Sequence, residues 1–462
     1  MSTFIKWLNF YRNVKGRLDL MLFFFKWDSD YRKDLTTTLL AFALFGYSVV
    51  SWNTFYDLIA MAVEAAIIMV QVGGEMSIMP SDYRPSHGGV TYSAQHSTHI
   101  ANDELSFPMS AVLPAPSEAA LGFGNPVDDI KTCKESPLVS SKVDDILMTR
   151  KKIPYREEKE PINFITSRHQ LRYIAIRVLN KLTHTTNGVL LAFHDMADSL
   201  AGDGPVTLRK AFYYDALLTV EAFRSRIFRG NLQNEKEVYT DLTTYFPVKR
   251  ETVDGQECLR FMPDFYKHVS LHMGITSLLL TENKRVAMLL QGSTNAVGAN
   301  MVCLGGSGSF NYADMKKSGH PEDFRDMAAY AMAREVCEET GIGNKWFKEV
   351  RKNTMVTGFF RWIDRCGLPE FIGITRAGKV PFSKKQAIDG DEVVKFDEVP
   401  ITVNKPEDFH QVLAYIHDNK INVALSSLMA LHRMTVIAGY GAGFATPEQK
   451  EIYRKVSEFL AA

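Results

Sequence analysis

The stretch 334–342 of this chain places three glutamates and an arginine at the end of a predicted helix. At about 100° per residue, one apolar stripe along this helix becomes acidic halfway. Its apolar part is Phe324, Met327, Ala328 and Ala331, and its acidic continuation is Glu335, Glu338 and Glu339. Three carboxylates on one face repel one another, and burying them unpaired would be costly. Because carboxylate oxygens suit Mg²⁺ or Mn²⁺, ions that usually hold substrate phosphates, the stretch predicts a metal site for phosphate chemistry.

The residues around this stretch support a helix beside a ligand. Residues 320–323 supply a proline and two acids for a first turn, and Gly341 suits the position just past the last turn. Upstream, the run 305–309 predicts a glycine-rich loop whose backbone amides approach a ligand closely. Gly305, Gly306 and Gly308 are its candidate nucleotide-binding residues. The alternative is that the three glutamates form an ordinary solvated helix face.

The stretch also resembles a known motif, the Nudix box, Gly-x5-Glu-x7-Arg-Glu-apolar-x-Glu-Glu-x-Gly-apolar. Its second half matches at every specified position, namely Arg334, Glu335, Val336, Glu338, Glu339, Gly341 and Ile342. The first half departs twice. Asp326 stands where the first glutamate belongs, and His320 stands where the glycine belongs, with Gly319 one residue earlier.

The resemblance implies an α/β fold, the Nudix α/β/α sandwich, that hydrolyses a nucleoside diphosphate linked to another group. It implies that Glu335, Glu338 and Glu339 bind Mg²⁺ or Mn²⁺ and that Arg334 orients them. Arg334 and Glu338 are therefore the candidate catalytic residues. Many Nudix enzymes use a late acidic residue as base or further ligand, and Glu392 is the candidate here. The alternative for Glu392 is a plain turn acid.

Apolar, β-prone runs flank the box, as such a domain requires. They predict strands at 275–281, 286–290, 355–362 and 371–375, with turns at 282–284 and 367–369. An amphipathic helix at 422–438 is predicted to close the domain.

Two apolar runs near the beginning of the sequence predict a transmembrane hairpin at 35–74. The run 35–52 carries no charge and is just long enough to span a bilayer, and the run 58–72 contains Glu64. Lysines and arginines precede the first run, whereas the link 53–57 has none, which places both termini in the cytoplasm. Glu64 faces an oligomer interface or a watery path, or it has no special role in a tilted span. The alternative is a buried helical hairpin in a soluble domain.

The predicted organisation has five parts. They are a basic cytoplasmic or interfacial segment (1–34), the hairpin (35–74), a loosely structured linker (75–161), a Nudix-associated region (162–270) and the Nudix domain (271–462). The aromatic run 212–223 in the fourth part frames a nucleobase or packs against the domain that follows.

Composition excludes some classes of protein. The chain balances 53 Lys and Arg against 53 Asp and Glu, whereas a general nucleic-acid binder would be basic. Its five cysteines lack the paired spacing of a zinc site and fit a reducing cytosol.

Two functions remain. A hairpin followed by a Nudix domain resembles the transmembrane–Nudix effectors of cyclic-oligonucleotide anti-phage systems (CBASS) in bacteria. That resemblance implies a homo-oligomer in the inner membrane that binds a nucleotide or cyclic nucleotide made by a linked nucleotidyltransferase. The alternative is a membrane-tethered, Mg²⁺-dependent pyrophosphohydrolase.

Overall fold

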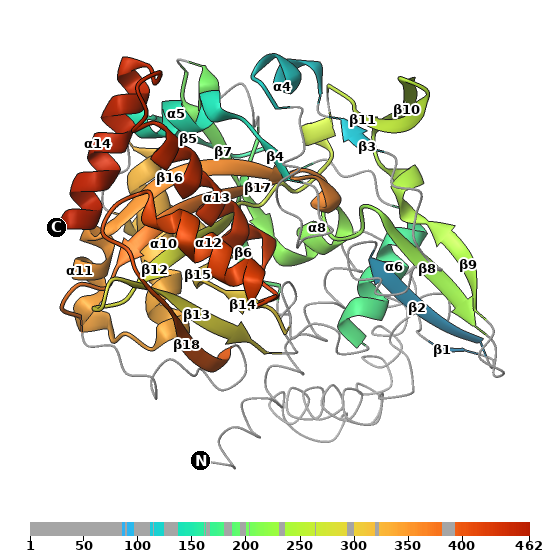
Figure 1. The fold of residues 1–462 in the computed structure, drawn as a ribbon. Coiled ribbons are helices and arrows are strands. Elements are labelled where there is room, and N and C mark those ends of the chain that lie inside the picture. Colours follow the sequence, from blue (N-terminus) through green and yellow to red (C-terminus); the bar gives the residue numbers. More distant parts are fainter. Residues whose placement is uncertain are drawn as a thin grey trace, which may run out of the picture. The chain divides into compact units, whose positions relative to one another are not determined.

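The protein has a mixed α/β fold in which described residues group into two compact units (Figure 1). One unit takes in the described parts of 1–95, 166–188 and 225–242, and the other takes in those of 96–165, 189–224 and 243–462. The computed structural model describes residues 86–87, 90–96, 111–113, 115–123, 137–160, 162, 167–179, 187–194, 200–202, 204–230, 236–263, 265–292, 300–318, 323–380 and 393–462.

Among its described residues, the first unit contains a four-stranded sheet in the order β1-β2-β8-β9 and the helix α6. In it, the Arg172 guanidinium carbon lies 5.0 Å from the centre of the Tyr239 ring, and the His169 ring meets that ring edge-on. These contacts join α6 to β9. The elements are β1 (Ser86–His87), β2 (Val90–His96), α6 (Arg168–Leu179), β8 (Ser225–Gly230) and β9 (Lys236–Asp241).

An eight-stranded sheet forms the centre of the second unit, with the order β14-β13-β12-β17-β16-β4. Two further strands join it, because β15 pairs with β12 and β18 pairs with β13. The strands are β4 (Pro137–Val139), β12 (Gly274–Leu280), β13 (Arg285–Gln291), β14 (Val302–Cys303), β15 (Gly305–Ser309), β16 (Thr354–Trp362), β17 (Leu368–Arg376) and β18 (Val393–Thr402).

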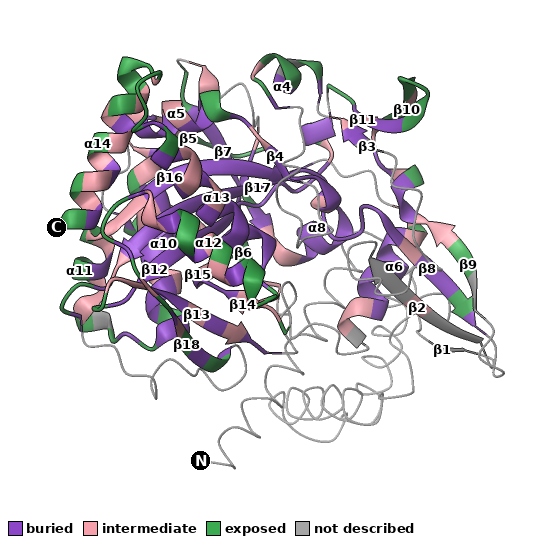
Figure 2. Ribbon diagram, in the orientation of Figure 1, coloured by how far each residue is buried: buried purple, intermediate pink, exposed green. Residues whose placement is uncertain are grey.

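The four strands predicted around the box are confirmed as β12, β13, β16 and β17. β12 and β17 run parallel and are almost entirely buried, which explains their continuous apolar sequences (Figure 2). The turn predicted at 367–369 is shorter, since Leu368 already belongs to β17.

Helices cover both faces of this sheet. A side chain at Gly373 would collide with the Met332 sulfur, so odd-numbered positions of β17 face α10 (Phe324–Thr340). Gly358, which is opposite Ile372, has the Asp144 and Arg433 side chains over its own face. That face is therefore covered by α5 (Ser141–Thr149) and α13 (Leu425–Gly439).

The box helix begins and ends close to its predicted limits. The Asp323 side chain accepts a hydrogen bond from the backbone N–H of Arg325, so Asp323 caps the helix rather than lying in its first turn. At the other end, Gly341 adopts a left-handed conformation with a φ of 67°, as the sequence predicted.

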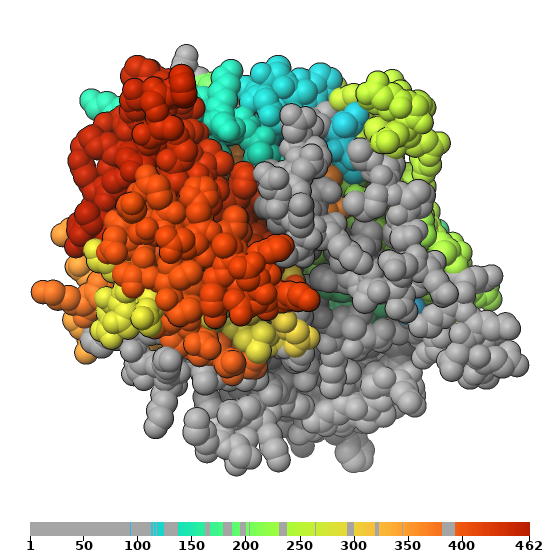
Figure 3. All heavy atoms as spheres, in the orientation of Figure 1, coloured from blue at the N-terminus to red at the C-terminus, as the bar shows by residue number. Residues whose placement is uncertain are grey.

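The helix predicted at 422–438 is confirmed as α13, but it does not close the domain, because α14 (Pro447–Ala461) follows it. Together with α12 (Asp408–Asp418), these helices make one continuous face in the space-filling view, coloured orange to red (Figure 3).

Shorter elements complete the second unit. Two three-stranded sheets have the orders β10-β11-β3 and β5-β7-β6. The remaining helices are α4 (Pro116–Ala120), α8 (Tyr213–Leu218), α9 (Tyr312–Lys317) and α11 (Phe347–Lys352), and the strands are β3 (Ala111–Leu113), β5 (Tyr155–Glu158), β6 (Val189–Phe193), β7 (Val206–Phe212), β10 (Val248–Val253) and β11 (Gln256–Phe261).

Residues 137–160 of the predicted linker have regular structure: β4 and α5 lie on the central sheet, and β5 pairs with β7 in a separate sheet. β4 pairs antiparallel with the end of β16, and α5 packs against the same strand. A three-residue strand such as β4 carries no usable periodicity, so the sequence did not indicate its pairing with β16.

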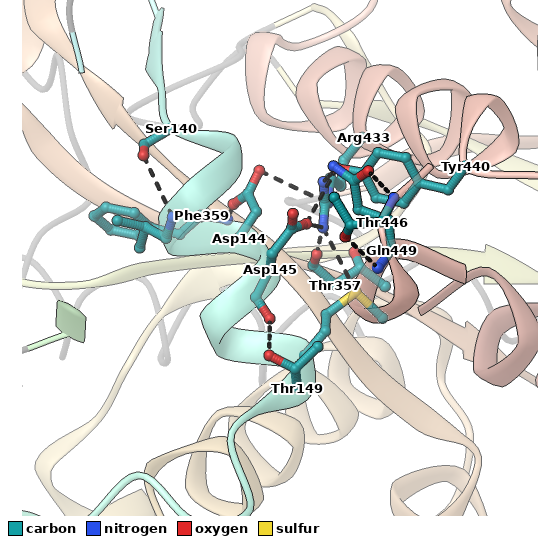
Figure 4. Close-up of polar contacts among 12 residues, drawn as sticks. Ser140, Asp144, Asp145, Thr149, Thr357, Phe359, Arg433, Tyr440, Thr446 and Gln449 are labelled. Atoms are coloured by element: carbon teal, nitrogen blue, oxygen red, sulfur yellow. Dashed lines mark hydrogen bonds and ion pairs between the residues drawn. The ribbon is translucent and has the colours of Figure 1, made fainter. Parts of the chain in front are cut away.

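A bulge in β16 anchors α5 to the sheet. The register of β16 against β17 shifts between Val356 and Gly358. The freed Phe359 N–H donates a hydrogen bond of 2.7 Å to Asp144 Oδ1 on α5 (Figure 4). A side chain at Gly358 would lie 2.9 Å from that oxygen, so glycine permits the approach.

Arg433 on α13 completes this anchor (Figure 4). Its Nε donates to the Thr357 carbonyl oxygen at 2.9 Å and lies 3.7 Å from an Asp144 oxygen. Its Nη1 donates to the Tyr440 hydroxyl and its Nη2 to Asp145 Oδ1, both at 3.1 Å. We call these four residues and Arg433 the Arg433 network, and it joins α5, β16 and α13.

The predicted hairpin at 35–74 lies outside the described residues. Within the described residues, every helix is too short or too polar to cross a bilayer.

Candidate functional site

The box helix α10 lies directly against the glycine strand β15. A side-chain carbon at Gly306 would lie 2.4 Å from the Val336 backbone nitrogen, and one at Gly308 would lie 2.3 Å from the Glu335 carboxyl carbon. At Gly306 only glycine allows this approach, because the neighbouring atoms belong to the helix backbone. The predicted glycine-rich loop is therefore wrong, because Gly305 to Gly308 form a strand paired with β12. These glycines position the acidic end of the helix.

One arginine binds the carboxylates at this end. Arg334 Nη1 donates to Glu335 Oε1 at 2.7 Å and to Glu338 Oε2 at 2.9 Å. Its Nε and Nη2 each donate to one oxygen of Asp314 at 3.0 Å, and Nη2 also donates to the Ser309 carbonyl oxygen. We call Arg334, Asp314, Glu335 and Glu338 the Arg334 cluster. It joins α10, α9 and the end of β15.

Solvent reaches the members of this cluster unequally. The Glu338 side chain is 58% exposed, whereas those of Glu335 and Asp314 are 13% and 1% exposed. The cluster therefore has one open side, at Glu338.

The third glutamate of the predicted metal set bonds to β15. Glu339 is buried, and its Oε2 accepts a hydrogen bond from the Ser307 backbone N–H at 3.1 Å. The Ser307 hydroxyl also donates to Glu339 and accepts from Gln291 Nε2 at 3.3 Å. Glu339 thus ties α10 to β15 on the inner side of the cluster.

Burial changes the proton affinity of the cluster. It raises the pKa of Glu335 to about 7, with Arg334 opposing the rise and Glu338 adding to it. Burial alone would lower the pKa of Arg334, but Glu335 and Asp314 raise it above its ordinary value. The cluster therefore carries more carboxylates than it can hold ionised with a single guanidinium.

Cysteine chemistry does not belong to this site. Burial raises the pKa of both Cys303 and Cys337 to about 12, so neither thiol ionises readily. Cys337 lies in the apolar core with Val336 and Leu279.

The donor set suits a hard cation, but the side chains are not arranged as a ready-made metal site. Among the described residues, no three His, Cys, Asp or Glu side chains are placed to hold a metal ion. Arg334 lies between Glu335 and Glu338, and Glu339 bonds to Ser307. Since carboxylates three and four residues apart share a helix face, rotation of side chains would bring their oxygens together.

The structure brings together Arg334, Glu335 and Glu338, as the sequence predicted, and places Glu339 beside them. Glu392 lies outside the described residues. Asp314 was missed, although the spacing Asn311-x-x-Asp314 is a helix-capping pattern and the Asn311 N–H donates to Asp314.

Two aromatic residues of the run 212–223 pack in the core. Tyr214 and Phe223 are fully buried, and the Phe223 ring contacts those of Phe246, Phe261 and Phe265. Both side chains are packed in the core, and the ring partners of Phe223 belong to the same predicted region, 162–270, rather than to the domain that follows it.

Comparisons with known proteins leave the family open. No protein-family model matches the chain, and no curated protein matches it. Among solved structures, the chain is similar to DR0079 from Deinococcus radiodurans, with 10% identity and a TM-score of 0.23. The match covers 35% of this chain and 82% of that one. Likeness at this level supports no conclusion about fold or function.

Proposed function

We propose that the region 271–462 is a Nudix-type domain, with that family's α/β/α sandwich, which binds a phosphate-bearing nucleotide through Mg²⁺ or Mn²⁺. The observation that carries this proposal is the Arg334 cluster, where one guanidinium is shared by Asp314, Glu335 and Glu338. The excess of carboxylates in a partly buried place favours a further cation.

Each residue has a defined part in this proposal. Glu335, Glu338 and Glu339 hold the cation. Arg334, which is itself bonded to Asp314, orients Glu335. The cation reaches the site at Glu338, because the Glu338 side chain is the most exposed in the Arg334 cluster. The bound cation would neutralise the phosphates and stabilise charge that develops on them. Gly306 and Gly308 let the helix that carries these carboxylates lie close to β15.

We further propose that this domain serves an effector of a CBASS-type anti-phage system. In that role the nucleotide is a signal, made by a linked nucleotidyltransferase, and a homo-oligomer acts on the inner membrane through the hairpin 35–74. Support comes from the sequence, namely the two apolar runs and the basic residues before them. The altered first half of the box, with Asp326 and His320, fits a domain that binds its nucleotide without having to hydrolyse it.

The alternative is a membrane-tethered pyrophosphohydrolase with Arg334, Glu338 and Glu392 as catalytic residues. The intact second half of the box favours it. In this case the membrane serves only to locate the enzyme.

One experiment separates the two functions. The full chain, reconstituted in vesicles loaded with a fluorescent dye, receives Mn²⁺ and either nucleoside diphosphate derivatives or cyclic dinucleotides. Binding, product formation and dye release are measured together. Binding and dye release without product support the effector, whereas product formation without dye release supports the hydrolase.

The controls are two matched substitutions. Glu338 and Glu458 are both exposed glutamates that pair with an arginine four residues earlier. Glu338→Gln should abolish binding or turnover, and Glu458→Gln should change neither. Equal behaviour of the two variants would reject the metal site.

A further inference from the structure

A tyrosine and an arginine lie next to the Arg334 cluster with hydrogen-bonding capacity to spare. Tyr330 is one helical turn, about 6 Å, before Arg334 on the same face of α10. Its hydroxyl lies within electrostatic range of Asp314, Arg334 and Glu338. Tyr330 is half-buried, and within the described residues its hydroxyl makes no hydrogen bond.

Arg351, on α11, holds its guanidinium over the same ring. Its guanidinium carbon lies 5.3 Å from the centre of the Tyr330 ring, and the Phe347 ring meets Tyr330 edge-on with centres 4.9 Å apart. Val350 anchors α11 in the apolar core, so the position of Arg351 is set by packing. Towards the described residues, the Arg351 guanidinium makes neither an ion pair nor a hydrogen bond. Five N–H donors of a charged group therefore stay available.

We propose that Arg351 and Tyr330 form an anion subsite beside the Arg334 cluster, which binds a second phosphate of the ligand. This inference rests on the proposed function, since it needs a cation and a first phosphate at Glu335 and Glu338. A guanidinium fixed over an aromatic ring presents its fork to phosphate oxygens. The Tyr330 hydroxyl, whose pKa burial raises, remains a neutral donor toward the same oxygens.

A cation at one end of this helix face and Arg351 at the other favour a ligand with two phosphates. Tyr330 precedes Glu338 by two turns, about 12 Å along the helix, with Arg334 midway. A ligand with a single phosphate can contact either the cation or Arg351. A ligand with two phosphates, as in a nucleoside diphosphate or a cyclic dinucleotide, can contact both the cation and Arg351.

The test measures binding to the full chain in detergent at saturating Mn²⁺, with AMP, ADP and cyclic di-AMP as probes. Arg351→Gln should weaken the binding of ADP or of cyclic di-AMP by about tenfold or more, as expected for a lost charged hydrogen bond. It should change AMP binding by less than about threefold. Tyr330→Phe keeps the ring contacts and should give a smaller loss. Arg351→Lys should restore part of the affinity, because it keeps the charge and loses the fork.

Lys352→Gln is the matched control, because it removes the same charge one residue away at an exposed position of α11. Equal losses in Arg351→Gln and Lys352→Gln would overturn the subsite and indicate a general charge effect. Loss of Mn²⁺ binding without nucleotide in Arg351→Gln would also overturn it, since Arg351 would then support the helix.

The same titrations separate this inference from the function on which it rests. If the wild-type chain binds ADP or cyclic di-AMP in a way that needs Glu338, and Arg351→Gln binds equally well, only the subsite fails. If the wild-type chain binds neither Mn²⁺ nor any probe, the proposed function fails, and the subsite fails with it.

Discussion

Arg433 and Arg334 lie in the same unit, and each shares one guanidinium among several carboxylates and a backbone carbonyl. Arg433 is 3% exposed, and its partners Asp144 and Asp145 are 8% and 21% exposed. Arg334 is 15% exposed, and its partner Glu338 is 58% exposed.

The two arginines also differ in the groups that their N–H donors bind. The Arg433 donors are directed to Thr357 on β16, to Asp145 on α5 and to Tyr440, which caps the end of α13. Arg334 Nη1, in contrast, is divided between Glu335 and Glu338 of its own helix. A cation can therefore replace Arg334 at Glu338 without moving any element, whereas the Arg433 network opens only if α5, β16 and α13 separate. Identical side-chain chemistry stabilises the fold in one place and leaves a site for a ligand in the other.

The largest expected difference is in stability. Arg433→Gln should lower the free energy of unfolding by about 3–5 kcal/mol, because it leaves two aspartates in a buried place without a cation. Arg334→Gln should cost about half as much, since Glu335 can take up a proton and Glu338 can turn to water. Urea unfolding of the full chain in detergent measures both. Equal losses would show that solvent access does not distinguish the two regions.

The Arg433 network should also respond to pH through Asp144. Burial raises the pKa of Asp144 to about 6 from 3.8, with Arg433 opposing the rise. Its contribution to stability is complete below pH 3.8 and is lost as the pH rises through 6. Asp144→Asn keeps an oxygen for the Phe359 N–H and does not titrate. Between pH 4 and 7 the variant should therefore gain up to about 3 kcal/mol relative to the wild type.

This comparison must be made as a difference between variant and wild type. Burial lowers the pKa of His272 to about 4, so its contribution is present above pH 6.5 and lost as the pH falls to 4. The two contributions oppose each other in the same pH range. A constant difference between Asp144→Asn and wild type across this range would contradict a desolvated Asp144.

The sequence predicted the regular parts of this half of the molecule. The runs 275–281 and 355–362 became β12 and β16, because β-branched and aromatic residues in short apolar runs favour buried strands. The stripe that begins at Phe324 became the buried face of α10. The acidic end was also predicted, since the contacts among Arg334, Glu335 and Glu338 are local to one helix.

The sequence did not predict the contacts between segments that are far apart in the chain. Asp145 and Arg433 are 288 positions apart, and neither belongs to a pattern that names its partner. The glycine strand β15 was predicted as a loop, since glycine usually marks loops and the need for glycine comes from helix α10 above it. Asp314 was missed for the same reason, because its partner Arg334 is on another element.

Two glycines of β15 test how closely α10 must lie. Gly306→Ala would bring a carbon to 2.4 Å from the Val336 backbone nitrogen, so the helix itself must shift, at a cost of about 1–3 kcal/mol in stability. Gly308→Ala would meet the Glu335 carboxyl group, which can rotate away. It should cost less stability but weaken Mn²⁺ binding. Thermal unfolding and Mn²⁺ titration of both variants measure these effects, and the reverse ranking would contradict the proposed place of Glu335.

The smallest expected effect is the stabilisation by Mn²⁺ itself. At ten times its dissociation constant, a ligand of the folded state adds about 1.4 kcal/mol to the free energy of unfolding. Glu338→Gln should remove this increment, whereas Asp144→Asn should retain it, because Asp144 belongs to the closed network. Unfolding with and without Mn²⁺ measures it. An increment that persists in Glu338→Gln would place the ion elsewhere.

The stabilisation by Mn²⁺ should also depend on pH. It should increase as the pH rises, whereas the contribution of Asp144 to stability decreases. Burial raises the pKa of Glu335 to about 7, so in the absence of a cation its contribution to stability is lost as the pH rises from 4.5 through 7. A bound cation requires the ionised carboxylate and therefore offsets this loss above pH 7. The affinity for Mn²⁺ should fall by about tenfold per pH unit below 7, toward the limit of one released proton. Calorimetric titration in two buffers of different ionisation enthalpy gives the number of protons released. Release of no proton would mean that the cation binds at Glu338 without Glu335, and the open side of the cluster alone would then be the site.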